Sequence, residues 1–292
     1  MHWLVEAAEQ LRAFSASFLC DLHMEQLQLD EVYAVLRERK AGEISDDEAM
    51  QRLERSPSWV WTAMAPQSKL LVVVDIGNRP LAMAQGVVHQ VTRVLAPGCV
   101  PLFLTDGLKD YATALLTHCG SWVHPARRKD KGPRPKPRWM PRPELLSAQV
   151  VKSYRRRRLV GVKHRVVFGS RLAIEQMLVR CGWTIDTAFV ERLNLDIRQR
   201  VAAIGRRVNT LCQGEAGVRD QLILFQVYHN FVLPHASLRQ PLLIPQPTNG
   251  RGSAKVGRPC TPAMAAGLTD HVWSLKEVLC YRMPPWPQPQ VQ

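Results

Sequence analysis

The 292-residue chain lacks the features that mark several large classes of protein. It has no apolar run approaching the ~20 residues that a membrane-spanning helix needs, so we expect no contact with a membrane. Its first residues lack the basic and apolar regions of a secretion signal, which favours the cytoplasm of a bacterial-type cell. Its seven cysteines contain no Cys-x-x-Cys pair, which argues against a disulfide framework and against a zinc module.

Motifs that supply a side-chain nucleophile or bind a nucleotide are also missing. The sequence has neither a Gly-x-Ser-x-Gly motif nor a P-loop. Chemistry at phosphorus needs neither of them, because a metal-bound water or a 3′-hydroxyl can attack phosphate directly. Such chemistry needs carboxylates that hold the metal, and the sequence has acids in or at the ends of predicted strands and on a predicted helix.

Positive charge is present in excess. The net charge is +14, and 15 of the 39 Lys and Arg residues lie between Pro125 and Arg165, against two acids. The rest of the chain holds 24 basic and 23 acidic residues, so a nearly neutral body carries one intensely basic segment. This distribution favours a nucleic-acid partner over the alternative of a solvated charged loop. The candidate DNA contacts in the segment are Arg155, Arg156, Arg157, Arg158, Lys163 and Arg165.

The hydrophobic pattern predicts alternating strands and helices. We expect helices over 3–20, 45–55, 80–95, 108–118, 187–211, 222–231 and 275–279, and strands over 25–36, 59–64, 70–74, 100–105 and 160–168. Three strands followed by helix, strand and helix indicate an α/β fold. The same order is that of the ribonuclease-H-like fold, a mixed sheet with helices on both faces.

Composition divides the chain into three parts. Residues 1–24 are expected to form a helix that we interpret as the remnant of a DNA-binding region, and residues 25–240 form the α/β core. The basic segment, about 125–165, is rich in proline and is expected to be an extended, partly mobile insertion in that core. Residues 241–292 are expected to form a Pro/Gly-rich, largely irregular tail.

Three acids stand where a metal site could form. Asp30 lies in an apolar strand, Asp106 ends a buried strand, and Glu191 lies one step off the apolar stripe of a helix. Each alone has an ordinary alternative: a turn or salt bridge for Asp30, a helix cap for Asp106, and a surface salt bridge for Glu191. Together they are the oxygen ligands that hard divalent cations prefer.

Other acids compete for the same task. Glu31 neighbours Asp30, but strand alternation turns it to the opposite face, so we expect only one of the two to face the site. The remaining rivals are Asp75, Asp110 and Glu175. Of these, Glu175 is the closest rival to the helical acid, because it also lies on a predicted amphipathic helix.

Two polar residues share a helix face with Glu191. Asn194 and Arg198 follow it at i+3 and i+7. An amide and a guanidinium beside a metal ligand suit contacts with DNA phosphates.

In their order along the chain, these motifs resemble those of the DDE transposases of bacterial insertion sequences, within the retroviral-integrase superfamily. The resemblance covers roughly residues 25–272. Its motifs are Leu29-Asp30-Glu31, Leu104-Thr105-Asp106-Gly107, Phe189-Val190-Glu191-Arg192-Leu193-Asn194 with Arg198, Tyr228-His229-Asn230-Phe231 with Pro234-His235 and Leu238, and Thr261-Pro262-Ala263-Met264-Ala265-Ala266-Gly267-Leu268. Each motif is short, but their order is specific.

The resemblance implies a ribonuclease-H-like core in which Asp30, Asp106 and Glu191 hold two Mg²⁺ or Mn²⁺ ions. It implies hydrolysis of a phosphodiester at the end of a mobile element, followed by strand transfer by the freed 3′-hydroxyl. The implied partner is double-stranded DNA, at the element's ends and at its target, with Asn194 and Arg198 near the scissile phosphate. Joining two ends implies at least a homodimer, associated with the bacterial nucleoid.

Two departures from the family pattern leave alternatives open. Asp106 and Glu191 are 85 residues apart, a longer gap than in compact members, and we expect the basic segment to be an insertion there. Only about 25 residues precede the core, whereas such transposases usually begin with a helix-turn-helix or zinc module, so we expect a truncated copy. The alternatives are a non-catalytic DNA-binding remnant or domesticated protein, and a ribonuclease-H-like structural or nuclease module acting on RNA–DNA hybrids.

Overall fold

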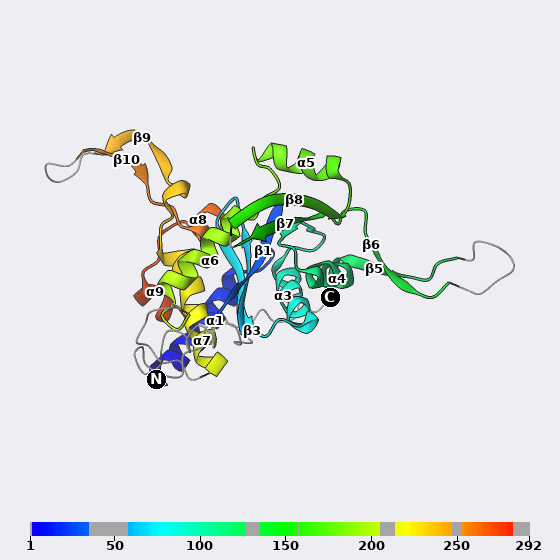
Figure 1. Ribbon diagram of the computed structural model, residues 1–292. Coiled ribbons are helices and arrows are strands. Elements are labelled where there is room, and N and C mark those ends of the chain that lie inside the picture. The colour runs from blue at the N-terminus through cyan, green and yellow to red at the C-terminus, as the bar shows by residue number, and fades with distance from the viewer. Residues whose placement is uncertain are drawn as a thin grey trace, which may run out of the picture.

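The computed structural model describes residues 2–34, 58–126, 135–156, 158–204, 214–246 and 253–282. The helix predicted over 45–55 lies outside these ranges. Within them, no helix is both long enough and apolar enough to cross a membrane. The chain folds as an α/β protein, with one six-stranded sheet flanked by helices (Figure 1).

The sheet is mixed and has the strand order β3-β2-β1-β4-β7-β8. The first three strands pair antiparallel, β4 and β7 continue parallel to β1, and β8 returns antiparallel to β7. The strands are β1 (Gln26–Tyr33), β2 (Trp59–Ala65), β3 (Leu70–Gly77), β4 (Leu102–Thr105), β7 (Ser147–Arg155) and β8 (Arg158–Phe168). All five predicted strands and the α/β class are confirmed.

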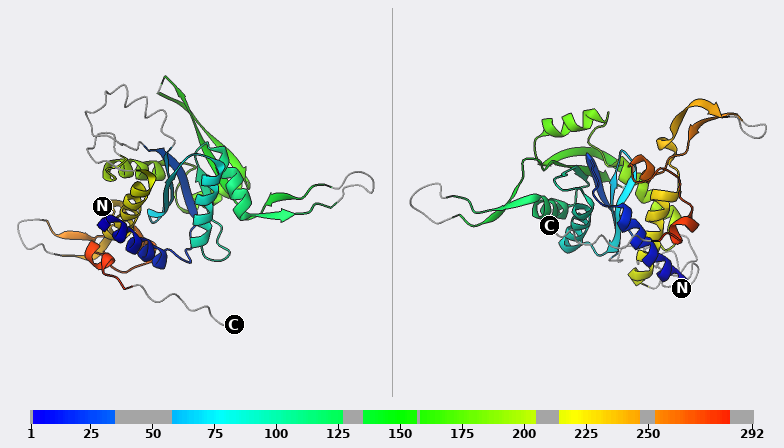
Figure 2. Two further views of the ribbon diagram at one scale, coloured as in Figure 1. Left: turned by 90° about the horizontal axis from the view of Figure 1, so that it is seen from below. Right: turned by 180° about the vertical axis from the view of Figure 1, so that it is seen from behind.

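Helices cover both faces of the sheet, which explains why β2, β3 and β4 read as continuous apolar runs rather than alternating ones (Figures 1 and 2). One face packs on α3 (Leu81–Val94) and α4 (Lys109–Cys119). The other face of β1 to β3 packs on α6 (Ala188–Arg200) and α7 (Gly214–Val227). Beyond them, α5 (Arg171–Arg180) covers β4 and β7.

The first helix and the C-terminal part share the main core. Helix α1 (His2–Phe18) buries Leu11 and Phe14 completely. The ring of Phe14 meets Phe231, Trp273 and Tyr281 edge-on, with centroids 5.0 to 5.4 Å apart. The short helices α8 (Pro262–Ala265) and α9 (Leu275–Leu279) complete this packing, so residues from both ends of the described chain belong to the same core as the sheet.

The basic segment is more ordered than its composition predicts. It contains β7, an interior strand of the sheet, and not merely an extended insertion. The reason is visible in Ser147–Val150, which are buried between β4 and β8, while the basic residues lie further along the strand. The segment also contributes β6 (Arg138–Pro141), which pairs with β5 (Gly120–Val123) in a hairpin that projects from the body (Figures 1 and 2).

Three further boundaries differ from the predictions. Helix α6 ends at Arg200, because Val201 takes an extended conformation, and the predicted continuation beyond 204 lies outside the described residues. Val201 and Ile204 remain buried against α7, so the apolar stripe was correct although the helix stops. Helix α7 begins earlier than predicted and ends in a π-helical turn, Tyr228–Val232. The region after Pro241 is not wholly irregular, since β9 (Gln240–Gln246) pairs with β10 (Lys255–Arg258).

Candidate metal centre

The pairing of two strands brings Asp30 and Asp106 together. β1 and β4 run parallel with Leu29 opposite Thr105, so the next residue along each chain is an aspartate at the same edge. In α/β proteins, ligands commonly bind beyond the carboxyl ends of parallel strands. The first two predicted acids therefore lie side by side where such a site would form.

Gln28 of β1 fixes the helix that carries Glu191. Its side-chain amide donates to the carbonyl oxygen of Asp186 (3.0 Å) and accepts a bond from the backbone N–H of Val190 (3.0 Å). Gln28 is 1% exposed, so both bonds are shielded from water. Because residues two apart on a strand share a face, Gln28 holds the start of α6 on the same side of the sheet as Asp30.

A cavity of about 390 Å³ opens between the ends of β1 and β4, the middle of β7 and the start of α6. Asp30, Asp106 and Glu191 all line it. The rest of its lining is Gly107, Val150, Val151, Lys152, Tyr154 and Thr187. The structure thus gathers the three predicted acids around one cavity.

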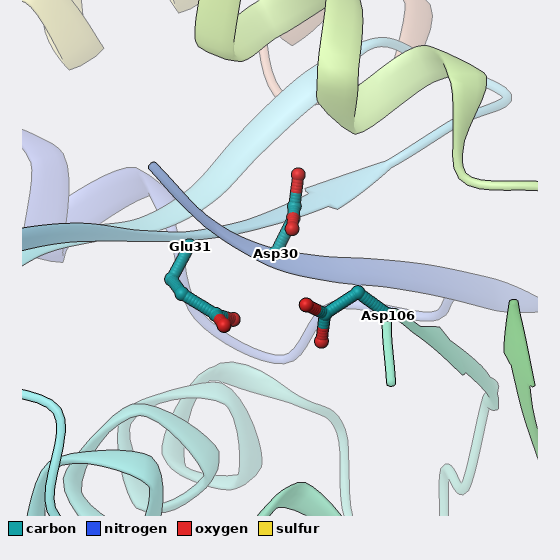
Figure 3. Close-up of side chains that lie close together, drawn as sticks. All are labelled: Asp30, Glu31 and Asp106. Atoms are coloured by element: carbon teal, nitrogen blue, oxygen red, sulfur yellow. The ribbon is translucent and has the colours of Figure 1, made fainter. Parts of the chain in front are cut away.

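A fourth acid, Glu31, lies close to the two aspartates. One carboxylate oxygen from each of Asp30, Glu31 and Asp106 lies within 4.8 Å of the others. Figure 3 shows Asp30 and Glu31 leaving opposite sides of β1, as alternation predicts, while Asp106 turns its carboxylate toward Glu31. Only Asp30 of these two neighbours lines the cavity, as expected, although the carboxylate of Asp106 on the neighbouring strand lies close to both.

Arg79, between β3 and α3, partly neutralises the Glu31 side of this cluster. Its guanidinium pairs with Glu31 and lies 3.9 Å from Oδ2 of Asp106. It also stands over the ring of Trp59, 4.5 Å from the centroid. The Glu31 side chain is 1% exposed, and its Oε2 has no hydrogen-bond partner among the described residues. Glu31 is therefore held by one arginine within a nearly dry environment.

Burial and mutual repulsion raise the pKa values of these acids. The pKa of Asp30 rises to about 7, first through burial and then through the negative charge of Asp106. The pKa of Glu31 rises to about 8, again chiefly through burial, although Arg79 opposes the rise. Burial also raises the pKa of Asp106. Carboxyl groups crowded in this way are stabilised when a cation binds among them.

Asn194 supports Asp30 directly. Its amide donates to Oδ2 of Asp30 (2.9 Å), and its carbonyl oxygen accepts a bond from the hydroxyl of Thr62 (3.1 Å). At 5% exposure it offers little surface to a phosphate, so its position fits an orienting task better than the predicted DNA contact. Arg198, one turn further, is exposed and accessible to a large ligand.

Glu191 has two partners at the cavity. It accepts bonds from the ammonium of Lys152, on β7, and from the hydroxyl of Thr187, which precedes α6. Its side chain is 40% exposed, compared with 33% for that of Asp106, so it stands at the open side of the cavity. Lys152 therefore neutralises the one predicted ligand that solvent reaches most easily.

The predicted DNA contacts gather on the ribbon formed by β7 and β8. Arg155 and Arg158 pair across its end, and Arg156 occupies the turn with a positive φ of 49°. Lys163 and Arg165 follow on β8, and all five of these side chains are exposed. Arg157 lies outside the described residues. Because Lys152 and Tyr154 of β7 line the cavity, this basic ribbon begins at the cavity's rim.

The three rival acids lie outside the cavity, and two of them pair with arginines. Asp75 pairs with Arg219 of α7, and Glu175 pairs with Arg171 on the exposed helix α5. Asp110 lies in the first turn of α4 and is not part of the cavity lining. None of the three joins the acidic cluster.

Gln28, Arg79 and Lys152 complete the site, and the sequence patterns did not identify them. Gln28 carried a usable signal, because an amide between leucines in a buried strand must find hydrogen-bond partners. Arg79 and Lys152 had no such signal, since one follows a strand and the other lies among many basic residues.

Comparison with known proteins finds no family model, no curated protein and no solved structure that matches this chain.

Proposed function

We propose that this chain is the catalytic region of a DDE-type transposase that cleaves and joins DNA strands at the ends of an insertion sequence. The observation that carries the proposal is the convergence of Asp30, Asp106 and Glu191 on one cavity at the rim of a basic ribbon. These acids come from three separate parts of the chain, so their convergence is a property of the fold. An acid-lined cavity beside a phosphate-binding surface suits metal-dependent chemistry on a polynucleotide.

The topology supports a ribonuclease-H-like core. Three antiparallel strands precede two strands parallel to β1, and helices flank both faces. This arrangement is compatible with that fold, with β8 as an added antiparallel strand at the edge. In this interpretation the basic segment includes core strand β7 together with the projecting hairpin and the ribbon that flank it.

The donor set fits hard divalent cations. Asp30, Asp106 and Glu191 offer carboxylate oxygens, which Mg²⁺ and Mn²⁺ accept as ligands. When bound, a pair of such ions activates the attacking oxygen and stabilises the leaving oxygen at phosphorus. The residues of the chain do the rest: Asn194 orients Asp30, and the ribbon holds the DNA backbone beside the cavity.

Replacing Asp106 with Asn tests the proposal. The variant keeps the shape of the side chain but loses a negative ligand, so we expect Mg²⁺-dependent strand cleavage to fall at least ~100-fold. Salt-sensitive binding to duplex DNA should stay within about twofold, because no phosphate contact is removed. The measurement is cleavage of labelled DNA carrying the element's end, alongside filter binding.

Glu175→Gln is the matched control, since Glu175 is an exposed acid outside the cavity. It should retain full cleavage. Cleavage by the Asp106→Asn protein at the rate of the unmodified chain would contradict the proposal.

One observation favours a second candidate, a DNA-binding remnant without catalysis. Lys152 pairs with Glu191 and holds its carboxylate in the manner of a bound cation. If this pair persists when Mg²⁺ or Mn²⁺ is added, the third ligand is unavailable and the protein only binds DNA. Absence of cleavage by the unmodified chain with either metal, together with tight DNA binding, would establish this alternative.

A further inference from the structure

The hairpin of β5 and β6, which we call the β5–β6 arm, projects away from the body (Figures 1 and 2). Its described parts are residues 120–126 and 135–141. The arm follows directly on the C-terminal end of α4, whereas Asp106 precedes the N-terminal end of that helix. Since α4 has 11 residues, the root of the arm lies ~16 Å along the helix from the acids.

Close contacts at the root of the arm fix its direction relative to α4. Gly120 joins α4 to β5, and a Cβ there would lie 2.2 Å from the carbonyl oxygen of Leu116 and 2.8 Å from that of Met140. Only glycine permits this close approach of helix and strand. Arg142, just after β6, donates from Nε to the carbonyl oxygen of Gly120 (3.3 Å) and closes the root. The arm is therefore a fixed extension of α4.

Two tryptophans face each other across the arm. Trp122 and Trp139 are directly opposite in the register, and their ring centroids are 5.5 Å apart. Such a cross-strand pair stabilises a hairpin, which accounts for the surfaces that the rings turn toward each other. It does not account for the ring surfaces that face solvent, since Trp122 remains 52% exposed and Trp139 38% exposed. Two large aromatic surfaces in water, side by side, are typical of a binding site.

The arm's charge identifies the kind of partner. Between Val123 and Met140 the sequence carries seven Lys and Arg residues against one acid. A partner surface for this arm must therefore be strongly negative. The same charge opposes pairing of two arms from two copies of the chain, since like charges would meet. A polyanion that also presents flat aromatic surfaces is a nucleic acid.

We propose that the β5–β6 arm is a separate nucleic-acid contact in which Trp122 and Trp139 stack on unpaired bases while Lys136 and Arg138, the basic residues of its described part, hold the backbone. Only bases outside a duplex expose their faces to an indole, so the arm favours single-stranded or opened DNA over intact duplex. The proposal rests on the proposed function in one respect only, namely that the natural ligand is DNA. Because the arm lies away from the acids, we expect it to contact a different stretch of nucleic acid from the one that is cut.

The test replaces both indoles by valine, Trp122→Val with Trp139→Val. Valine keeps the strand propensity of the arm but removes the stacking surface. We expect affinity for a fluorescent oligothymidylate to fall on the order of tenfold to a hundredfold, and affinity for a duplex of equal length to change less than about threefold. Anisotropy titrations without divalent metal measure both, so the result does not depend on catalysis.

Two control proteins make the outcome specific. The double tyrosine variant, Trp122→Tyr with Trp139→Tyr, retains aromatic faces and should recover most of the affinity for the single strand. Trp3→Val removes a tryptophan that is 69% exposed on α1, far along the fold from the arm, and should change nothing. The dependence of binding on salt should be the same in all variants, because no cation is removed.

Several results would overturn the proposal. Equal losses for single strand and duplex would show that the indoles only shape a cationic arm. Unchanged binding, or a change in oligomeric state on size-exclusion chromatography, would assign the indoles to hairpin stability or to a protein contact. Unimpaired cleavage by the Asp106→Asn protein would contradict the proposed function but would leave all of these metal-free binding measurements intact, so the two proposals fail separately.

Discussion

Two neighbouring carboxylates on β1 meet opposite environments. Asp30 points toward α6, into a cavity that solvent and a ligand can enter, and receives a neutral hydrogen bond from Asn194. Glu31 points toward α3 and α4, where its side chain is 1% exposed and pairs with Arg79. The first arrangement leaves negative charge available for a cation, and the second neutralises it with a residue of the chain.

The difference shows how one strand can serve two tasks. Strand alternation alone sends adjacent side chains to different layers. Asp106 stands at the boundary and interacts with both, because its carboxylate faces Glu31 while it also lines the cavity of Asp30. We infer that the Glu31–Arg79 pair forms a support beneath Asp106, and that Asp30 and Glu191 form the open ligand side.

The largest expected effect is on the stability of the metal-free protein as pH rises. The pKa values of Asp30 and Glu31 are raised to about 7 and about 8 in the fold, from 3.8 and 4.5 for the ordinary groups. The native state therefore binds more protons than the unfolded state between these limits, so stability is lost as pH rises through them. We expect the free energy of unfolding to fall by on the order of 4 kcal/mol between about pH 5 and about pH 8.5.

Urea denaturation at a series of pH values, with a chelator present, measures this loss. Asp30→Asn and Glu31→Gln should each flatten part of the profile and should be more stable than the unmodified chain at the alkaline end. Adding Mg²⁺ at that end should restore stability through Asp30 and Asp106, since the cation binds only the native arrangement. A flat profile in the unmodified protein would show that the two carboxyl groups are not desolvated as the structure indicates.

The sequence could predict that Asp30 and Asp106 lie together, because their positions depend on local pattern. Asp30 and Asp106 follow apolar runs, and parallel pairing of neighbouring strands then brings them together. Glu191 was predicted from its place beside the apolar stripe of a helix and from the resemblance motif. Its approach to the cavity depends on Gln28, whose bonds to Asp186 and Val190 at the start of α6 span more than 150 residues of sequence. Contacts of that range depend on the whole fold, so no local pattern could reveal them.

Residues 125–165 show that a strand can also be missed when its place depends on distant pairing partners. Proline and arginine dominate 125–165, so composition predicted an extended insertion and concealed β7. Only Ser147–Val150 of that strand are buried, and this stretch is too short to stand out against its charged neighbours. Its place between β4 and β8 comes from pairing partners, not from its own propensity.

A second, smaller effect concerns only the Glu31 side of β1, where Arg79 pairs with the carboxylate. Arg79→Met removes the cation that faces Glu31, and its effect should depend on pH because Arg79 stabilises the ionised carboxylate more than the protonated acid. Below the Glu31 pKa of about 8, the acid is protonated and we expect a loss of about 1 kcal/mol. Above it, the uncompensated buried charge should cost about 2–3 kcal/mol, less than for a fully buried pair because Arg79 is 37% exposed.

Unfolding curves on either side of that pKa measure the difference. Arg171→Met, which removes an exposed partner of Glu175, is the control and should cost under ~0.5 kcal/mol at both pH values. Combining Arg79→Met with Glu31→Gln should abolish the pH dependence, since no ionisable group then remains in the pair. Equal losses at both pH values would indicate that Arg79 acts through its stacking on Trp59 instead.

The smallest effect concerns the tyrosine beside Glu31. The hydroxyl of Tyr111 is fully buried and has no hydrogen-bond partner among the described residues, and burial with the nearby acids raises its pKa well above the usual range. Tyr111→Phe keeps the edge-on contact with Trp61 and removes an unsatisfied polar group, so we expect a gain of about 1 kcal/mol in unfolding free energy. Tyr281→Phe, at a partly exposed ring, should be nearly neutral. If Tyr111→Phe destabilised the protein instead, the hydroxyl would be donating to Glu31, and that carboxylate would have a second internal partner besides Arg79.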